Sequence, residues 1–383
     1  MRIRAALATG ALLAVAACSG SADVQPDSSP QPAPTRDAPE ATPSPAATPA
    51  PVFPGTRWSR AERGDWAALD ADLAANGSTC VAVVKDGRLV HDAYWNGGSA
   101  RTPQKVYSIA KSLSSLLAGM AAGDGTLDLD APAGEHVEQW RGTDAGQVTA
   151  RSLLSMTSGR RWSDAADRQM IRAVRDQSSY AAGLAQDAAP GERWVYDNAA
   201  VQTLESVLDD AVGADVGAAA QARLLDPLGM RDTVWGRDAA GNALTYSGMQ
   251  STCLDLARVG HLMLNAGSWR GRQIVPGDYV REATRPSSVL NAAYGLLWWT
   301  NAGGRVVEVL RQAGFAADKP PYRGSLAPNV PADAFWAFGY GNQYIAVVPS
   351  EGVVAVRLGA RPATPDRVTF DGFTSGVLDA LDR

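Results

Sequence analysis

The chain has 383 residues, of which 45% are hydrophobic and 20% are charged, as in an ordinary globular protein. Its formal net charge of −5 gives no electrostatic footprint for binding nucleic acid. Only four of its 35 basic residues are lysines (Lys85, Lys105, Lys111 and Lys319), so a lysine placed among apolar residues is a candidate for a specific role.

Residues 1–17 have the layout of an export signal. A basic start is followed by a short apolar run from Ala5 to Ala17, which is too short to span a bilayer. The run ends in Val-Ala-Ala-Cys at Cys18, which resembles the lipobox where bacterial lipoproteins are cut and then acylated on the cysteine. We therefore expect an exported protein, lipid-anchored through Cys18 to the outer face of the cytoplasmic membrane. Ordinary secretion, with Cys18 unmodified, is the alternative.

Residues 18–57 are expected to form a disordered tether. Residues 26–54 hold ten of the 23 prolines, and no aromatic residue precedes Phe53. Such a segment buries too little apolar surface to offset the entropy lost on ordering. Folding is therefore predicted to begin near Trp58, and residues 58–383 are enough for one large domain.

Residues 58–383 begin and end with strand patterns and are helical in between. Asp86-Gly87 predicts a hairpin turn between strands at 79–85 and 88–94. Apolar residues at helical spacing predict a helix that starts at Ser108 and stops near Gly123. Further helices are expected at 150–157, 199–212, 254–265 (capped by Thr252) and 371–381, and further strands at 294–300, 343–348 and 352–358.

This order of elements predicts the α/β (α+β) fold class. One antiparallel sheet would be built from both chain ends and flanked by helices, with a mainly helical subdomain inserted at about residues 111–285. In an exported protein Cys80 and Cys253 can form a disulfide, although two separate buried cysteines fit the sequence equally well. We expect a monomer with its active site at the seam between the two parts.

Two common kinds of catalytic site are not favoured. No serine lies in a Gly-x-Ser-x-Gly turn, and His91, His136 and His261 are better explained as structural or surface residues. Three distant histidines, without a closely spaced cysteine pair, give no metal-binding signature. The sequence therefore predicts a site that uses neither a metal nor an organic cofactor.

A lysine can replace histidine as the base that activates a serine. Ser108 and Lys111 lie three residues apart at the start of a predicted helix, so their side chains share one face. The N–H groups of a helix N-terminus can stabilise an oxyanion, and burial can lower the pKa of a lysine, whereas an arginine stays protonated. The alternative is a capping serine beside a solvated lysine, because Ser-x-x-Lys arises readily by chance.

Tyr196-Asp197-Asn198 follows the turn at 190–193 and precedes a predicted helix. Tyr196 could relay a proton, and Asn198 could orient the substrate or the lysine. On its own, this triplet is better explained as a capped helix start with Tyr196 in the core.

Five stretches together point to one family: Tyr107 to Ser112 (YSIAKS), Leu153 to Gly159 (LLSMTSG), Pro190-Gly191 before Tyr196-Asp197-Asn198, Pro227 to Met230 (PLGM), and Ser251-Thr252 leading into Asp255 to Arg258 (DLAR). In order and context they resemble the serine β-lactamase and penicillin-binding-protein superfamily across nearly all of residues 60–380. The resemblance is closest to the branch that contains β-lactamase-fold carboxylesterases and nylon-oligomer (6-aminohexanoate-dimer) hydrolases. It implies an acyl-enzyme mechanism in which Ser108 attacks, Lys111 is the base and Tyr196 relays a proton.

The third motif of the superfamily, a Lys/His-Thr/Ser-Gly run on the strand beside the site, is absent. The equivalent stretch, Phe338 to Tyr344, is Gly-rich and close to the form found in the nylon-hydrolase branch. The resemblance implies that the N–H of Tyr340 joins the N–H of Ser108 in the oxyanion hole, and Gly341 is predicted to belong to the same substrate or oxyanion site. The cation that usually binds a substrate carboxylate is missing from this stretch, so we expect esters or linear amides to be preferred over penicillins.

The sequence therefore predicts an exported serine hydrolase that cleaves an ester or amide in a small molecule through an acyl-serine. A β-lactamase or DD-peptidase on the same fold is the first alternative. The second is a catalytically silent cell-envelope lipoprotein that binds peptidoglycan fragments or a partner, although the intact Ser108, Lys111 and Tyr196 argue against it. Contact with the membrane is expected only through the lipid anchor.

Overall fold

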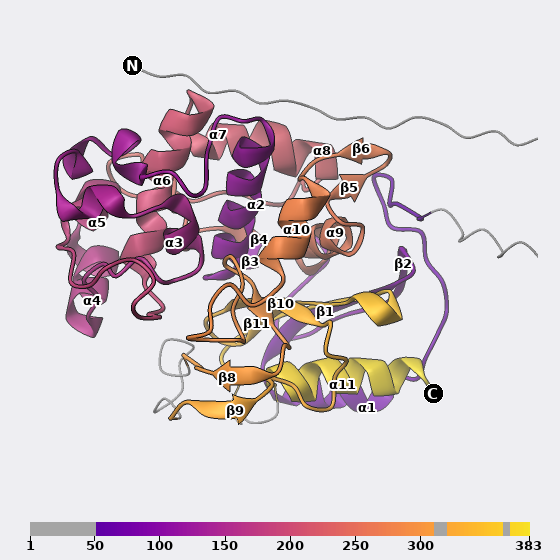
Figure 1. The fold of residues 1–383 in the computed structure, drawn as a ribbon. Helices are drawn as coiled ribbons and strands as arrows, with labels where there is room; N and C mark the ends of the chain where they lie inside the picture. The colour runs from indigo at the N-terminus through magenta and orange to yellow at the C-terminus, as the bar shows by residue number, and fades with distance from the viewer. Residues whose placement is uncertain (1–50, 310–319, 363–367) are drawn as a thin grey trace, which may run out of the picture. The chain divides into compact units, whose positions relative to one another are not determined.

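The computed structural model describes residues 51–309, 320–362 and 368–383 (Figure 1). The predicted signal peptide, Cys18 and most of the predicted tether lie outside these residues. Within the described ranges, no helix is long and apolar enough to cross a membrane.

The largest sheet has six strands in the order β2-β1-β12-β11-β10-β7, and every pairing is antiparallel. Both chain ends contribute to it, which confirms the predicted fold class. Its strands are β1 (Ser78–Lys85), β2 (Arg88–Tyr94), β7 (Trp299–Thr300), β10 (Phe335–Gly339), β11 (Gln343–Val348) and β12 (Val353–Gly359). The short pairs are β3 (Gln104–Lys105) with β4 (Gln250–Ser251), β5 (Ser268–Trp269) with β6 (Arg272–Gln273), and β8 (Gly304–Val306) with β9 (Tyr322–Gly324).

The hairpin between β1 and β2 forms at the predicted turn. Asp86 and Gly87 both have positive φ angles, 50° and 77°, as a two-residue turn of the right twist requires. The other edge of β1 pairs with β12, where Val81 lies opposite Arg357 and Val84 opposite Val354. The carboxyl end of the chain therefore completes the sheet that its amino end begins.

Helices cover both faces of this sheet (Figure 1). On one face α9 packs so closely that a Cβ on its Gly260 would come within 2.3 Å of Val354 Cγ1. On the other face, in α11, Phe373 stacks on Tyr344 with ring centres 5.5 Å apart. The helices are α1 (Ala67–Ala75), α2 (Ile109–Gly123), α3 (Ala150–Leu154), α4 (Asp164–Ala173), α5 (Gln177–Gly183), α6 (Asn198–Val212), α7 (Val216–Ala220), α8 (Asp226–Leu228), α9 (Cys253–Leu264), α10 (Gly277–Ala283) and α11 (Phe370–Leu381).

Helix α2 lies between the sheet and the helical region. Every residue from Ile109 to Ala121 is buried, as expected for a helix that is packed on all sides. Its buried serines all find partners; Ser112, for example, donates to the carbonyl oxygen of Leu297 at 2.7 Å. This packing fixes the position of the first turn of α2, which carries Ser108 and Lys111.

Cys80 of β1 and Cys253 at the start of α9 form a disulfide. Residues 51–57, which the sequence assigns to the tether, contact the folded domain. His261 Nε2 contacts the carbonyl oxygen of Val52 at 2.8 Å, and Phe53 packs edge-on against His261 and Trp269. Arg258 of α9 also donates to the carbonyl oxygens of Gly55 and Thr56, so ring packing and backbone hydrogen bonds together hold residues 51–57 on α9.

Two predicted elements differ from the structure. Of the predicted strand 294–300, only Trp299 and Thr300 are extended, because Leu297 has a φ of +61° and the chain turns there. Residues 294–300 are apolar because they are buried, and not because they form a hydrogen-bonded strand over their whole length. Helix 150–157 ends at Leu154, since Met156 also has a positive φ. Helices α4 and α5 were not predicted.

Candidate active site

The N-terminal turn of α2 positions Ser108. The residue before it, Tyr107, has a φ of +50°, an unfavourable value for a non-glycine residue, and its ring packs against that of Tyr340 at 5.3 Å. Ser108 occupies the capping position of the helix, but its side chain makes no capping hydrogen bond. Its hydroxyl is therefore available to other groups.

The Nζ atom of Lys111 has three polar neighbours. Asn198 Oδ1 lies at 2.6 Å, the carbonyl oxygen of Tyr246 at 3.0 Å and Ser108 Oγ at 2.9 Å. The first two atoms can only accept hydrogen bonds. As an ammonium, Lys111 donates to all three oxygens. As a neutral amine it keeps two N–H groups for the two obligate acceptors, and its lone pair is left for the hydroxyl proton of Ser108. The contacts therefore suit a neutral lysine that accepts the serine proton.

Electrostatics also favours this protonation state. Lys111 is 1% exposed, and burial lowers its pKa to about 7, although the carboxylates of Asp167 and Asp197 oppose the shift. A base with a pKa near the working pH is well matched to proton transfer. Lys111 is thus chemically suited to act as a general base.

Tyr196 lies beside this pair. Its ring is buried, and burial raises the pKa of its hydroxyl, against the effect of a hydrogen bond with Ser108. The ring centre is 4.8 Å from Nζ of Lys111, and the ring stacks on Trp299. Because the phenol remains protonated at neutral pH, it can donate a proton rather than act as a resting phenolate.

Asn198 connects Lys111 to a carboxylate on α4. Its Oδ1 accepts from Lys111, and its Nδ2 donates to Asp167 Oδ2 at 2.7 Å. Burial raises the pKa of Asp167, whereas the bond from Asn198 and the charge of Lys111 lower it. The other oxygen of this carboxylate, Oδ1, is buried and has no hydrogen-bond partner among the described residues. Asp197, the neighbour of Asn198, caps α6 by accepting from two backbone N–H groups.

The hairpin between β10 and β11 brings Tyr340 to the serine. Ser108, Asn198 and Tyr340 line one small cavity of about 40 Å³. The close approach depends on Gly339, where a Cβ would lie 2.3 Å from the carbonyl oxygen of Val106. Gly341 is in the same turn but lines neither this cavity nor the larger cleft, and its carbonyl oxygen accepts from Arg357 at 2.7 Å.

A larger cleft of about 620 Å³ opens on Ser108. Part of its wall is apolar, because the exposed side chains of Ile171 and Tyr340 face it. The wall also carries three cations, Lys105, Arg168 and Arg172, and two carboxylates, Asp164 and Asp167. The cations come from β3 and α4, and none comes from the strand that carries the third motif in the superfamily.

Residues 32–372 match the family described as Beta-lactamase, which is most of the chain. The chain belongs to the β-lactamase family. The resemblance found in the sequence is therefore confirmed.

Several solved structures share the fold of this β-lactamase-family protein. A Bacillus anthracis protein described as a 6-aminohexanoate-dimer hydrolase is 19% identical, with 84% of this chain and 86% of that chain covered and a TM-score of 0.69. A Bacteroides dorei protein described as a β-lactamase is also 19% identical, with 84% and 100% covered and a TM-score of 0.66. A D-alanine carboxypeptidase from Burkholderia cenocepacia is 21% identical, with 82% and 97% covered and a TM-score of 0.55.

The structure of this family member brings five of the predicted site residues together: Ser108, Lys111, Tyr196, Asn198 and Tyr340. Other groups beside them are not expected from the sequence: the carboxylate of Asp167, the carbonyl of Tyr246 and the cations of the cleft. Ser163 followed by two acidic residues is a helix-start signal that could have revealed α4, but nothing in it indicates that the helix reaches Lys111.

The three histidines lie elsewhere in this β-lactamase-family fold. His91 contacts Asp70 at 2.8 Å, His136 contacts Asp210 at 2.7 Å, and His261 packs on the N-terminal segment. Over the described ranges, no group of three His, Cys, Asp or Glu side chains is arranged to hold a metal ion.

Proposed function

We propose that this protein is a serine hydrolase that cleaves an ester or amide bond through an acyl intermediate on Ser108. The observation that carries this proposal is the set of contacts around Lys111. Nζ lies 2.9 Å from Ser108 Oγ, two obligate acceptors hold two of its N–H groups, and burial brings its pKa to about 7, so the neutral amine can take the proton of the Ser108 hydroxyl. A pure binding module would have no use for a buried lysine in this state.

The reaction follows from these positions. Lys111 takes the hydroxyl proton as Ser108 Oγ attacks the carbonyl carbon, and the carbonyl oxygen becomes an oxyanion facing the N–H groups of Ser108 and Tyr340. The bond to the leaving oxygen or nitrogen then breaks, and Tyr196 gives that atom a proton and regains one from Lys111. A water molecule attacks the acyl group, loses a proton to the same groups, and releases the acid and free Ser108.

The substrate we propose is an ester or a linear amide. The end of β10 has no cation for a carboxylate next to the scissile bond, and Ile171 and Tyr340 present apolar surface to the cleft. The fold shared with a protein described as a 6-aminohexanoate-dimer hydrolase supports this class. A β-lactamase or DD-peptidase activity is the second candidate, because Lys105, Arg168 and Arg172 could pair with a substrate carboxylate from another wall.

We also propose that the protein acts outside the cytoplasm, anchored by a lipid on Cys18. The signal-like residues 1–17 support export. The disulfide between Cys80 and Cys253 is typical of an oxidising compartment.

The test combines covalent labelling with a substrate panel. A fluorophosphonate probe should label Ser108, as located by peptide mass spectrometry, and Ser108→Ala should abolish both labelling and turnover. Wild-type turnover by Ser108→Ala would refute the mechanism. For the substrate class, kcat/KM is compared for short-chain p-nitrophenyl esters, linear amides and a chromogenic cephalosporin. A higher value for the cephalosporin would replace the proposed class with the β-lactamase candidate.

A further inference from the structure

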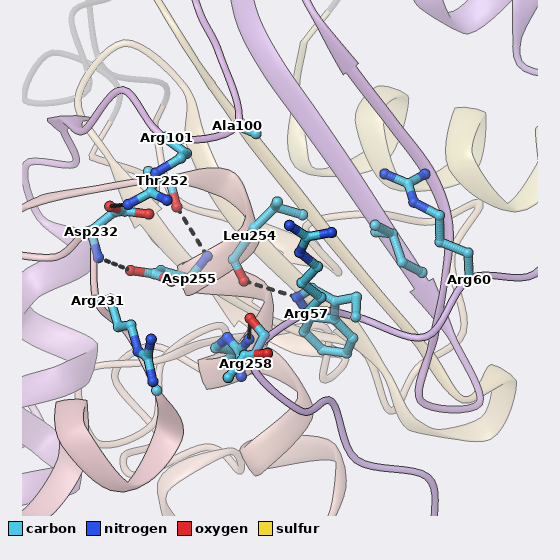
Figure 2. A pocket seen from close by; sticks show the side chains of 14 residues that line it. Arg57, Arg60, Ala100, Arg101, Arg231, Asp232, Thr252, Leu254, Asp255 and Arg258 are labelled. Carbon is cyan, nitrogen blue, oxygen red and sulfur yellow. Dashed lines mark hydrogen bonds and ion pairs between the residues drawn. The ribbon is translucent and has the colours of Figure 1, made fainter.

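A second cavity, separate from the catalytic cleft, is lined by arginines (Figure 2). Its volume is about 670 Å³, within the range of small-molecule binding sites. It shares no lining residue with the two cavities at the catalytic serine. The arginines are Arg57, Arg60, Arg101, Arg231 and Arg258. Such a concentration of positive charge is unexpected in a chain whose net charge is −5.

Segments that are distant in the sequence bring these charges together. Arg57 and Arg60 come from the N-terminal segment on one side, and Arg101 and Arg231 come from the opposite side (Figure 2). Arg258 is on α9, between the two sides. The arrangement therefore depends on the tertiary fold and is not a run of charge along the chain.

The acidic residues of the cavity are already engaged. Asp232 pairs with Arg101 at 3.2 Å. Asp255 Oδ2 accepts from the backbone N–H of Asp232 and from the hydroxyl of Thr233, both at 2.9 Å. The lining thus has two carboxylates and five guanidinium groups. The carboxylate of Asp255 is already engaged with the backbone N–H of Asp232.

Three of the five arginines, Arg57, Arg231 and Arg258, form no ion pair with a described carboxylate. Arg60, by contrast, pairs with Asp92, which lies outside the lining. Arg258 is 4% exposed and donates to three backbone carbonyl oxygens instead of a carboxylate. Burial lowers its pKa, Asp255 opposes that shift, and the neighbouring charge of Arg231 adds to it. Neither Arg57 nor Arg231 has a side-chain hydrogen bond or ion pair with any described residue.

We propose that this cavity binds a phosphate group carried by an organic molecule, with Arg57 and Arg231 as direct ligands. Guanidinium groups bind phosphate oxygens through paired, charge-assisted hydrogen bonds. A multiply charged anion also offsets the repulsion among several guanidinium groups more fully than a single carboxylate does. Trp58 and Leu254 in the lining offer apolar surface for the organic part. A soluble phosphate ester and a phospholipid headgroup both have this chemistry.

The first test is calorimetric titration of the full-length chain carrying Cys18→Ser with inorganic pyrophosphate at constant ionic strength. We expect the double variant Arg57→Ala/Arg231→Ala to weaken binding by at least about 10-fold, since charge-assisted bonds contribute more than neutral ones. The matched control is Arg272→Ala/Arg323→Ala, which removes the same charge from exposed strands elsewhere and should leave Kd unchanged. Equal Kd values for the two double variants, or no pyrophosphate binding at all, would overturn the proposal.

A second measurement separates binding from folding. Without ligand, Arg57→Ala/Arg231→Ala should melt no lower than wild type, because these side chains are exposed and pair with no residue that the structure describes. A lower melting temperature would assign both arginines to stability and overturn the proposal. Vesicles then identify the source of the phosphate. Binding to phosphatidylglycerol vesicles but not phosphatidylcholine vesicles, lost in the same variant, supports a headgroup, whereas pyrophosphate binding alone supports a soluble ester.

Discussion

Replacing Asp167 by asparagine should shift the pH dependence of serine activation to lower pH. The carboxylate of Asp167 is connected to Lys111 through the side chain of Asn198, and its negative charge stabilises the lysine ammonium. Asp167→Asn keeps the size of the side chain and an oxygen that can accept from Asn198, and it removes only the charge. The pKa of Lys111 should therefore fall, and a larger fraction of Lys111 is neutral at any given pH.

The size of the shift follows from the geometry. Two hydrogen bonds of 2.6 and 2.7 Å separate Lys111 Nζ from the carboxylate, with one amide group between them. Opposite charges roughly 7 Å apart attract by about 2 kcal/mol at an effective dielectric constant of about 20. One pKa unit corresponds to about 1.4 kcal/mol, so the pKa of Lys111 should drop by about one to two units from its value near 7.

The assay is the second-order rate of Ser108 labelling by a fluorophosphonate across pH, which needs no knowledge of the natural substrate. In wild type the rate should fall as the pH drops through the pKa of Lys111, because the protonated lysine cannot take the serine proton. The matched control is Asp164→Asn in the same cleft, since Asp164 is not among the charges that shift Lys111. If the acidic limb of Asp167→Asn coincides with that of wild type or moves to higher pH, the electrostatic argument is wrong.

Four further variants test other parts of the site and the anchor. Lys111→Ala should reduce labelling nearly as much as Ser108→Ala. The double variant should be little worse than either single variant, because the two residues act as one catalytic unit. Additive losses would argue against a shared step. Tyr196→Phe should lower kcat by roughly 10²-fold or more, and an unchanged rate and pH profile would return Tyr196 to the core. Gly339→Ala should lower the melting temperature, because the added Cβ clashes with the backbone at a cost of about 1–3 kcal/mol. A melting curve like that of wild type would contradict the close approach of Gly339 to Val106. Cys18→Ser should move the protein from the membrane to the soluble fraction, whereas a soluble wild type with a free thiol at Cys18 would refute the anchor.

The elements that were predicted well are those whose signal is local. The Asp86-Gly87 turn, the cap at Thr252 and the apolar face of α2 each depend on residues a few positions apart, and the structure has all three. The run 294–300 was read wrongly because an apolar stretch can be buried in turns as well as in a strand. Local patterns therefore predict elements with strong turn, cap or spacing signals, but they overextend the helix at 150–157, miss α4 and α5, and fail where burial alone sets the composition.

The residues of the candidate active site show the same difference between local and long-range signals. Ser108 and Lys111 lie three residues apart, so one helical turn is enough to predict their contact. The contact between Asp167 and Asn198 joins two helices, and it depends on how α4 packs over α6. Likewise, the arginine cavity gathers five arginines from four separate segments, and no spacing in the sequence marks them as a group. Sequence patterns alone therefore cannot predict charges that interact only through tertiary contacts.

The disulfide between Cys80 and Cys253 has a consequence for the order of folding. Strand β12, which completes the sheet beside β1, is synthesised long after β1, whereas Cys253 precedes it in the chain. Once the two cysteines are joined, β1 is held next to α9, the helix on which β12 packs. The loop that pairing Cys80 with Leu358 must close then shrinks from roughly 280 to roughly 105 residues, which lowers its entropy cost by about 1 kcal/mol. Early oxidation therefore makes the last strand easier to add, and refolding from the reduced chain should be the slower route.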